Sequence, residues 1–210
     1  MSAKLARDKS ASVIGQLKPS EIVSWSDLCR FLDKLKDEES EHDFDFGHES
    51  VEEFIDYIKG GIAFITYSLG VDGISVEMVK YARALESLKG AGLSKKAKVH
   101  WISGEFDERS GFFSSSSIKK LKLEAISGFD KWGDRYAALF RRRMKRGSDD
   151  YMRLPSLIWR EALDIAKRLE EYFTKNSIRL ILTANTNSVP GNVSLALALV
   201  LVSEKLRIPV

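Results

Sequence analysis

The sequence of 210 residues contains a single cysteine, Cys29. This count excludes an internal disulfide and any zinc site built from several thiolates. It also fits a reducing compartment, and we expect a cytoplasmic protein. The sequence contains no Walker loop, no HExxH, no GxSxG and no cluster of Cys and His. The usual sequence signs of a P-loop nucleotidase, a metalloprotease, a serine hydrolase and a zinc site are therefore absent.

Long apolar segments are scarce as well. The longest, residues 193–202, is interrupted by Ser194 and spans about ten residues, whereas a bilayer requires roughly 20. Residues 1–16 mix charged and small side chains and lack the apolar run of a signal peptide. We therefore expect neither a membrane span nor secretion by that route.

Charge of one sign does not dominate this chain. Lys and Arg number 33 against 30 Asp and Glu, which gives a formal net charge of +3. The one basic block, residues 141–146, lies in no recognisable groove-reading module, so we expect a solvated helix end and no nucleic-acid partner. A hydrophobic fraction of 44% is too high for a disordered chain and predicts a folded domain.

Two regimes of pattern divide the chain. Residues 1–58 hold no convincing strand and predict a helical N-terminal extension, with helices over residues 20–37 and 50–59. From residue 59 onward, apolar runs alternate with amphipathic segments. These predict strands at 61–68, 98–103, 121–126 and 178–184, and helices at 74–88, 129–146, 154–175 and 190–204, with Pro155 in a first turn. The order is typical of an α/β fold with a Rossmann-like, doubly wound parallel sheet over residues 59–210.

The last three residues, 208–210, have the composition of a strand that is only beginning. A typical strand runs about five or six residues, so we expect this sequence to be the front part of a longer protein, truncated at its C-terminus. The alternative is an edge strand that tolerates Pro209.

Three loops follow the predicted strands at the sheet edge where doubly wound folds bind ligands. The first contains Gly70, Asp72, Gly73 and Ser75, whose glycines permit close approach of a phosphate or sugar to a helix N-terminus. The alternative is a tight strand-to-helix turn. The second contains Glu105, and Asp107 beyond it, as acceptors for substrate hydroxyls or as members of a solvated acidic loop.

The third loop, residues 183–192, is the richest in neutral polar side chains. Asn185, Asn187 and Asn192 stand among Thr and Ser between a buried strand and a helix. Their donors and acceptors suit a polyhydroxylated ligand. Helix capping and Asx turns are the alternative.

Four segments carry a resemblance to a known family. They are VDGISVEMVKYARALESL from residue 71, KVHWISGEF from residue 98, GFDKWGDRY from residue 128 and ILTANTNSVPGNVSLALALVLVSEKLRIPV from residue 181. Together they resemble the N-terminal half of retaining GT-B glycosyltransferases of family 4, which includes sucrose and sucrose-phosphate synthases. The resemblance covers residues 60–210.

The resemblance implies a hexosyltransferase with two Rossmann-like domains, which needs no metal or cofactor. The first domain would hold the acceptor and the second the nucleotide-diphosphate sugar. Gly70, Asp72, Gly73 and Ser75 would approach the donor phosphates and sugar, while Glu105, Asn185, Asn187 and Asn192 would face the acceptor. The catalytic residues and the C-terminal donor domain would lie beyond Val210, so the chain alone should not catalyse transfer.

A partner domain missing from the chain would leave apolar surface exposed, which predicts association of copies into a homo-oligomer. The competing interpretation is a stand-alone carbohydrate-binding or regulatory module that has lost catalysis.

Overall fold

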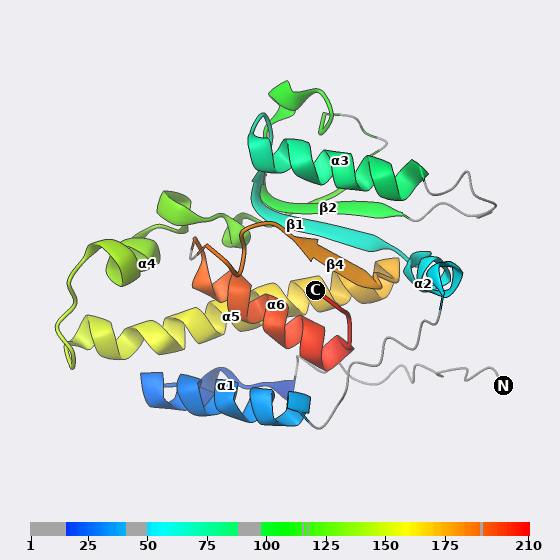
Figure 1. Cartoon of the computed structure of the whole chain (residues 1–210). Coiled ribbons are helices and arrows are strands. Elements are labelled where there is room, and N and C mark those ends of the chain that lie inside the picture. The colour runs from blue at the N-terminus through cyan, green and yellow to red at the C-terminus, as the bar shows by residue number, and fades with distance from the viewer. Residues whose placement is uncertain (1–15, 41–49, 88–97, 115, 117, 190) are drawn as a thin grey trace.

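A four-stranded, all-parallel sheet forms the centre of the computed structural model, which describes residues 16–40, 50–87, 98–114, 116, 118–189 and 191–210. The strands are β1 (Ile62–Leu69), β2 (Val99–Phe106), β3 (Lys119–Lys122) and β4 (Leu180–Thr183), and their spatial order is β3-β2-β1-β4. Helices flank the sheet on both faces (Figure 1). The predicted Rossmann-like α/β fold is therefore confirmed.

The two faces of the sheet are covered by different helices. In β1, Ala63 and Ile65 belong to the core shared with α5 (Asp149–Asn176) and α6 (Val193–Leu206). Their neighbours Ile62 and Phe64 belong instead to the core shared with α3 (Gly73–Ser87). Successive side chains of a strand point to opposite faces, so a nearly continuous apolar run is what burial on both sides requires.

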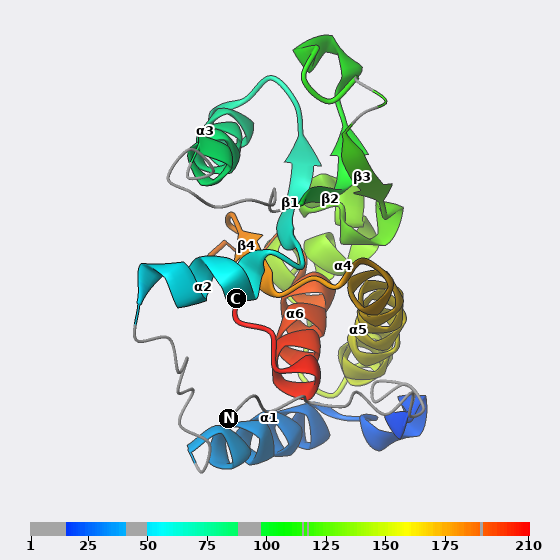
Figure 2. The same cartoon turned by 90° about the vertical axis from the view of Figure 1, so that its right-hand side faces the viewer.

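The N-terminal helices lie against this domain (Figure 2). The outermost layer is α1 (Trp25–Ser40), which contacts α5 through an edge-on pair of Phe31 and Trp159 rings, 4.9 Å between centroids. The indole of Trp159 also donates to the carbonyl oxygen of Lys18, 2.9 Å away. On the other side, α2 (Val51–Ile58) places Ile58 in the core beneath α3. Short 3₁₀ helices cover Pro19–Glu21, Glu108–Ser110, Glu124–Ile126 and Phe129–Trp132.

Three of the predictions for helices are wrong. The continuous helix over residues 129–146 is broken into a 3₁₀ turn, the short helix α4 (Asp134–Tyr136) and a π-helical turn (Ala137–Arg141), because Gly133 has a φ of 69°. Helix α5 begins at Asp149, so Pro155 lies inside the helix rather than in its first turn. Helix α6 begins at Val193, three residues later than predicted, because Asn192 caps it.

The C-terminal segment lies along the edge of the sheet but does not form a regular strand. The Ile181 N–H of β4 donates to the carbonyl oxygen of Pro209, 2.9 Å away, and Ile208 is buried. Residues 208–210 therefore lie beside β4, on the side away from β1. Within the described ranges, every helix falls short of the length and apolarity that crossing a bilayer demands.

Candidate functional site

A cleft lies where β1 and β2 end side by side. The two strands pair in register up to Leu69 and Phe106, and the Asp107 N–H then donates to the Leu69 carbonyl oxygen at 2.7 Å. The cleft has a volume of about 470 Å³. It is lined by residues 68–72 and 105–107 together with Arg109, Lys122 and Lys131, and we call it the strand-end cleft. The sequence predicts a ligand site at this edge of the sheet.

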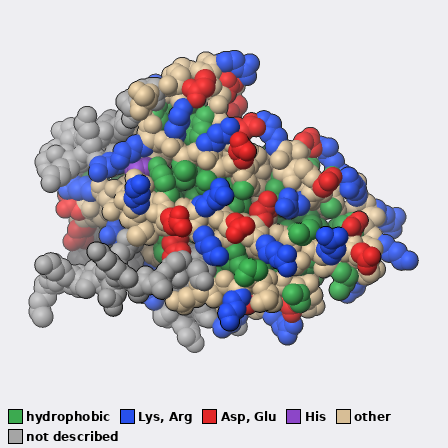
Figure 3. Space-filling view, turned by 180° about the vertical axis from the view of Figure 1, so that it is seen from behind, with side chains coloured by type: hydrophobic (Ala, Val, Ile, Leu, Met, Phe, Trp, Pro, Cys, Tyr) green, Lys and Arg blue, Asp and Glu red, His purple; other side chains and the backbone are tan. Residues whose placement is uncertain are grey.

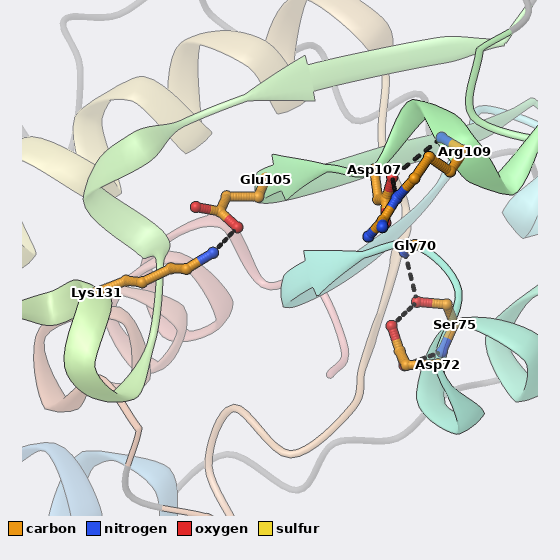
Figure 4. Close-up of polar contacts among 7 residues, drawn as sticks. All are labelled: Gly70, Asp72, Ser75, Glu105, Asp107, Arg109 and Lys131. Atoms are coloured by element: carbon orange, nitrogen blue, oxygen red, sulfur yellow. Dashed lines mark hydrogen bonds and ion pairs between the residues drawn. The ribbon is translucent and has the colours of Figure 1, made fainter.

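Ser75 fixes the loop after β1, as Figure 4 shows. Its buried hydroxyl accepts from the Gly70 N–H at 2.9 Å and donates to Asp72 Oδ2 at 2.7 Å. The other carboxylate oxygen, Oδ1, accepts from the Ser75 N–H at 2.9 Å, so Asp72 caps the start of α3. Asp72 and Ser75 thus hold the loop in shape, and only Asp72 reaches the cleft lining.

The two glycines of this loop have different surroundings. A Cβ on Gly70 would lie 2.6 Å from the Cβ of Asp107, closer than two carbon atoms can approach. A Cβ on Gly73 would have no atom within 4 Å. Close packing of the β1 and β2 ends therefore requires the glycine at 70, whereas Gly73 leaves open space in front of the first turn of α3.

Two ion pairs lie in the cleft lining, one between distant segments and one within the turn after β2. Glu105, at the end of β2, pairs with Lys131, which lies in the 3₁₀ helix Phe129–Trp132. Asp107 is held by Arg109, with the Arg109 Nη2 to Asp107 Oδ2 distance at 2.6 Å. Hydrogen bonds from the Arg109 side chain and backbone lower the pKa of the Asp107 carboxyl to about 2, so it is ionised at neutral pH. Lys122, at the end of β3, lies 3.6 Å from Glu124.

The charges of the cleft balance. Asp72, Glu105 and Asp107 supply three carboxylates, and Arg109, Lys122 and Lys131 supply three cations. Carboxylates accept hydrogen bonds from hydroxyls, and ammonium and guanidinium groups donate to hydroxyl oxygens. Such a set suits a neutral ligand rich in hydroxyl groups better than a strongly charged one.

The loop between β4 and α6 is organised by Tyr67 of β1. The Tyr67 hydroxyl accepts from the N–H groups of Gly191 and Asn192, at 3.2 and 3.3 Å, and lies 2.8 Å from the carbonyl oxygen of Val189. A Cβ on Gly128 or on Gly191 would lie 2.6 Å from the Tyr67 ring. Glycine at both positions allows the ring to fit between two backbone segments.

The three asparagines of that loop are placed differently. Asn185, with φ at 62°, and Asn187 are exposed, and Asn187 Oδ1 accepts from the Thr186 hydroxyl at 2.9 Å. Asn192 is fully buried and uses its whole amide. Its Oδ1 accepts from the Leu195 N–H, and its Nδ2 donates to the carbonyl oxygens of Ala125 and Ser127, all at 2.9 Å.

The structure thus brings together some of the predicted residues. Gly70, Asp72 and Glu105 line the strand-end cleft, and Gly73 and Ser75 lie beside it in the first turn of α3. The asparagines do not line it. The Phe129 N–H donates to the Gly191 carbonyl oxygen at 2.7 Å, which ties their loop to the segment that carries Lys131.

Lys122 and Lys131 were not predicted as site residues, because they come from segments distant in sequence. Lys131 is part of the GFDKWGDRY segment, and that membership is the one feature of the sequence that could have pointed to Lys131 as a site residue. In the described part of the chain, no three His, Cys, Asp or Glu side chains gather in an arrangement suited to a metal ion. Comparisons with protein-family models, curated proteins and solved structures found no match to this chain.

Proposed function

We propose that this chain is the acceptor-binding part of a retaining glycosyltransferase, which moves a hexosyl group from a nucleotide-diphosphate sugar to a hydroxyl acceptor. The observation that carries the proposal is the strand-end cleft, with its balanced ion pairs Glu105–Lys131 and Asp107–Arg109. The sequence resemblance supplies the reaction class, and the cleft supplies a place for the acceptor.

The paired charges suit vicinal hydroxyl groups. A sugar hydroxyl donates to one oxygen of Glu105 or Asp107, and its neighbour accepts from Lys131 or Arg109. Both ion pairs are exposed to solvent at least in part, so a hydroxyl ligand can open them at little cost. Hydroxyls that replace water around these groups would fix the orientation of the acceptor, and a fixed orientation lowers the barrier to transfer.

The start of α3 offers a place for the donor. The N–H groups of Gly73 and Ile74 have no protein acceptor among the described residues, and no atom would oppose a Cβ at Gly73 within 4 Å. Free N–H groups at a helix N-terminus favour negative charge. In our proposal the donor diphosphate, carried mainly by a second Rossmann-like domain, comes close to this turn when the acceptor is in place.

A second candidate is a carbohydrate-binding or regulatory module without catalysis. Within the described residues, all three carboxylates of the cleft are engaged by Ser75, Lys131 or Arg109, which leaves none poised as a general base. A binding module needs no such base, whereas the transferase must take its catalytic residues from beyond Val210. The two candidates share the cleft. They differ in whether a nucleotide sugar binds together with the acceptor.

The test is saturation-transfer NMR on the purified chain with a panel of monosaccharides and disaccharides, each measured with and without UDP-glucose and GDP-mannose. We expect sugar signals that weaken about tenfold in Glu105→Gln. Glu108→Gln is the matched control, because Glu108 is an exposed carboxylate that pairs with Lys120 outside the cleft. Equal signals in both variants would refute the acceptor site. Sugar binding unaffected by any nucleotide sugar would favour the binding module.

A further inference from the structure

A second cavity, of about 280 Å³, is separate from the strand-end cleft and borders α5. Its floor is apolar and includes Leu123 and Ile165. Three arginines surround it, Arg135 from α4 and Arg160 and Arg168 from α5, and we call it the arginine pocket. Figure 3 views the molecule from the α5 side and shows many Lys and Arg side chains over this face, with fewer Asp and Glu between them.

One N–H of the Arg135 guanidinium lacks a hydrogen-bond acceptor among the described residues. Its Nε atom is buried without a hydrogen bond, and the nearest acid is Glu161, whose Oε2 lies 3.4 Å away. That oxygen already accepts from the Trp132 indole at 2.8 Å and from the Ser194 hydroxyl at 2.7 Å. Both of its lone pairs are therefore used, and the buried N–H of Arg135 remains unsatisfied, which is costly unless a ligand completes it.

Arg160 and Arg168 are also available. They are exposed, lie two turns apart on α5, and form no ion pair or hydrogen bond with another described residue. Asp164 lies between them in sequence and lines the same pocket, yet it is not within ion-pair distance of either. Side chains four residues apart on a helix can pair. Because Asp164 pairs with neither arginine, the charges of Arg160 and Arg168 face the solvent and the cavity.

The charges of the pocket favour an anion. Three guanidinium groups face two carboxylates. Arg135 pairs with Glu161, which leaves Arg160 and Arg168 against Asp164 alone and gives the pocket a net positive charge. Guanidinium groups bind phosphate oxygens with two parallel N–H bonds, and they hold phosphate more specifically than lysine does. The apolar floor would accommodate a small organic group attached to the phosphate.

We propose that the arginine pocket binds the phosphate group of a small phosphorylated molecule. The site is independent of the strand-end cleft, since the two share no lining residue. They are nevertheless neighbours along the chain. Lys122 lines the cleft and Leu123 the pocket, and Lys131 and Arg135 are four residues apart in the sequence. A bound phosphate would therefore fix the segment that carries Lys131 into the cleft.

The test is isothermal titration calorimetry at constant ionic strength with inorganic phosphate and with glycerol 3-phosphate. We expect saturable binding of one phosphate group per chain below about 10 mM. Arg160→Gln and Arg168→Gln should each weaken it about tenfold, because each removes charged hydrogen bonds. Arg153→Gln is the matched control, an exposed arginine of α5 that does not line the pocket. Asp164→Asn should tighten binding up to about fivefold by removing a nearby negative charge.

Tighter binding of glycerol 3-phosphate would identify a phosphate monoester as the ligand, and equal binding would show that the pocket recognises the phosphate group alone. Absence of saturable binding by the wild-type chain, or the same affinity in all the arginine variants, would overturn the proposal. Weaker binding by Asp164→Asn would also overturn it, since an anion in this cavity must gain from the loss of that carboxylate.

Discussion

Replacing Asn192 with Ala should destabilise the fold more than any other change in the 185–192 loop. The side chain is fully buried, and it connects α6 with the segment that follows β3. The variant loses the N-cap of α6, worth about 1 kcal/mol. It also leaves the carbonyl oxygens of Ala125 and Ser127 without this donor, at about 1 kcal/mol or more each. The expected loss is about 3 kcal/mol, or a fall in Tm of roughly 6–12 °C for a chain of this size.

Urea denaturation followed by circular dichroism measures this loss, and two variants separate its causes. Asn192→Ser keeps an oxygen that can cap α6 and removes only the two amide donors, so it should lose about 1 kcal/mol less than Asn192→Ala. Asn187→Ala, at an exposed site, should change stability by about 0.5 kcal/mol or less. A loss below about 0.5 kcal/mol for Asn192→Ala would refute the structural role that we assign to this amide.

Three further outcomes follow from the packing. Gly70→Ala should lower the free energy of unfolding in urea by about 1–3 kcal/mol, whereas Gly73→Ala should leave it unchanged or raise it, because only the Cβ at position 70 meets another atom. The reverse order of stabilities would be inconsistent with the geometry of the loop. Tyr67→Phe should cost about 1–3 kcal/mol and speed amide exchange at residues 191 and 192, and unchanged exchange would contradict the role of the hydroxyl. Burial, aided by two nearby lysines, lowers the pKa of His100 to about 4 from 6.5, so the unfolded chain takes up a proton first and the stability of the fold decreases as pH drops from 6.5 to 4. His100→Leu should show a smaller decrease in stability over this range, and an equal decrease would count against this effect of burial.

The sequence predicted the sheet well because its central strands are buried on both faces. The apolar runs over residues 61–68, 98–103 and 178–184 correspond to β1, β2 and β4. The third strand was less well placed, and β3 covers Lys119–Lys122 rather than 121–126. Beyond Leu123 the chain turns into a 3₁₀ helix, and alternation over a few residues does not distinguish a short edge strand from such a turn.

Helical periodicity failed where backbone geometry outweighed it. The apolar spacing over residues 129–146 resembles a helix, but Gly133 adopts a left-handed φ and ends the regular pattern. Pro155 suits a first turn, yet Ser148 caps α5 earlier by accepting from the Tyr151 N–H. Both errors come from local capping and glycine conformation, which a hydrophobic pattern does not record.

The candidate site was predictable in one half only. The loops after β1 and β2 could be found because parallel strands end at one edge, and Gly70, Asp72 and Glu105 meet there. Lys122 and Lys131 reach the same cleft from the end of β3 and from the turn near Phe129, and no spacing in the sequence predicts that meeting. Helix capping was one of two roles open to Asn192 in the sequence, whereas its bonds to Ala125 and Ser127 are seen only in the folded chain.

The central claim is that the strand-end cleft binds a polyhydroxylated acceptor, and an amide-resolved NMR titration tests it most directly. The protein would be titrated with the strongest sugar from the panel while its backbone amide signals are followed. Our account predicts saturable shifts concentrated at residues 70–72, 105–107 and 131, and their loss in Glu105→Gln but not in Glu108→Gln. Shifts confined to other parts of the chain, or identical shifts in both variants, would contradict it.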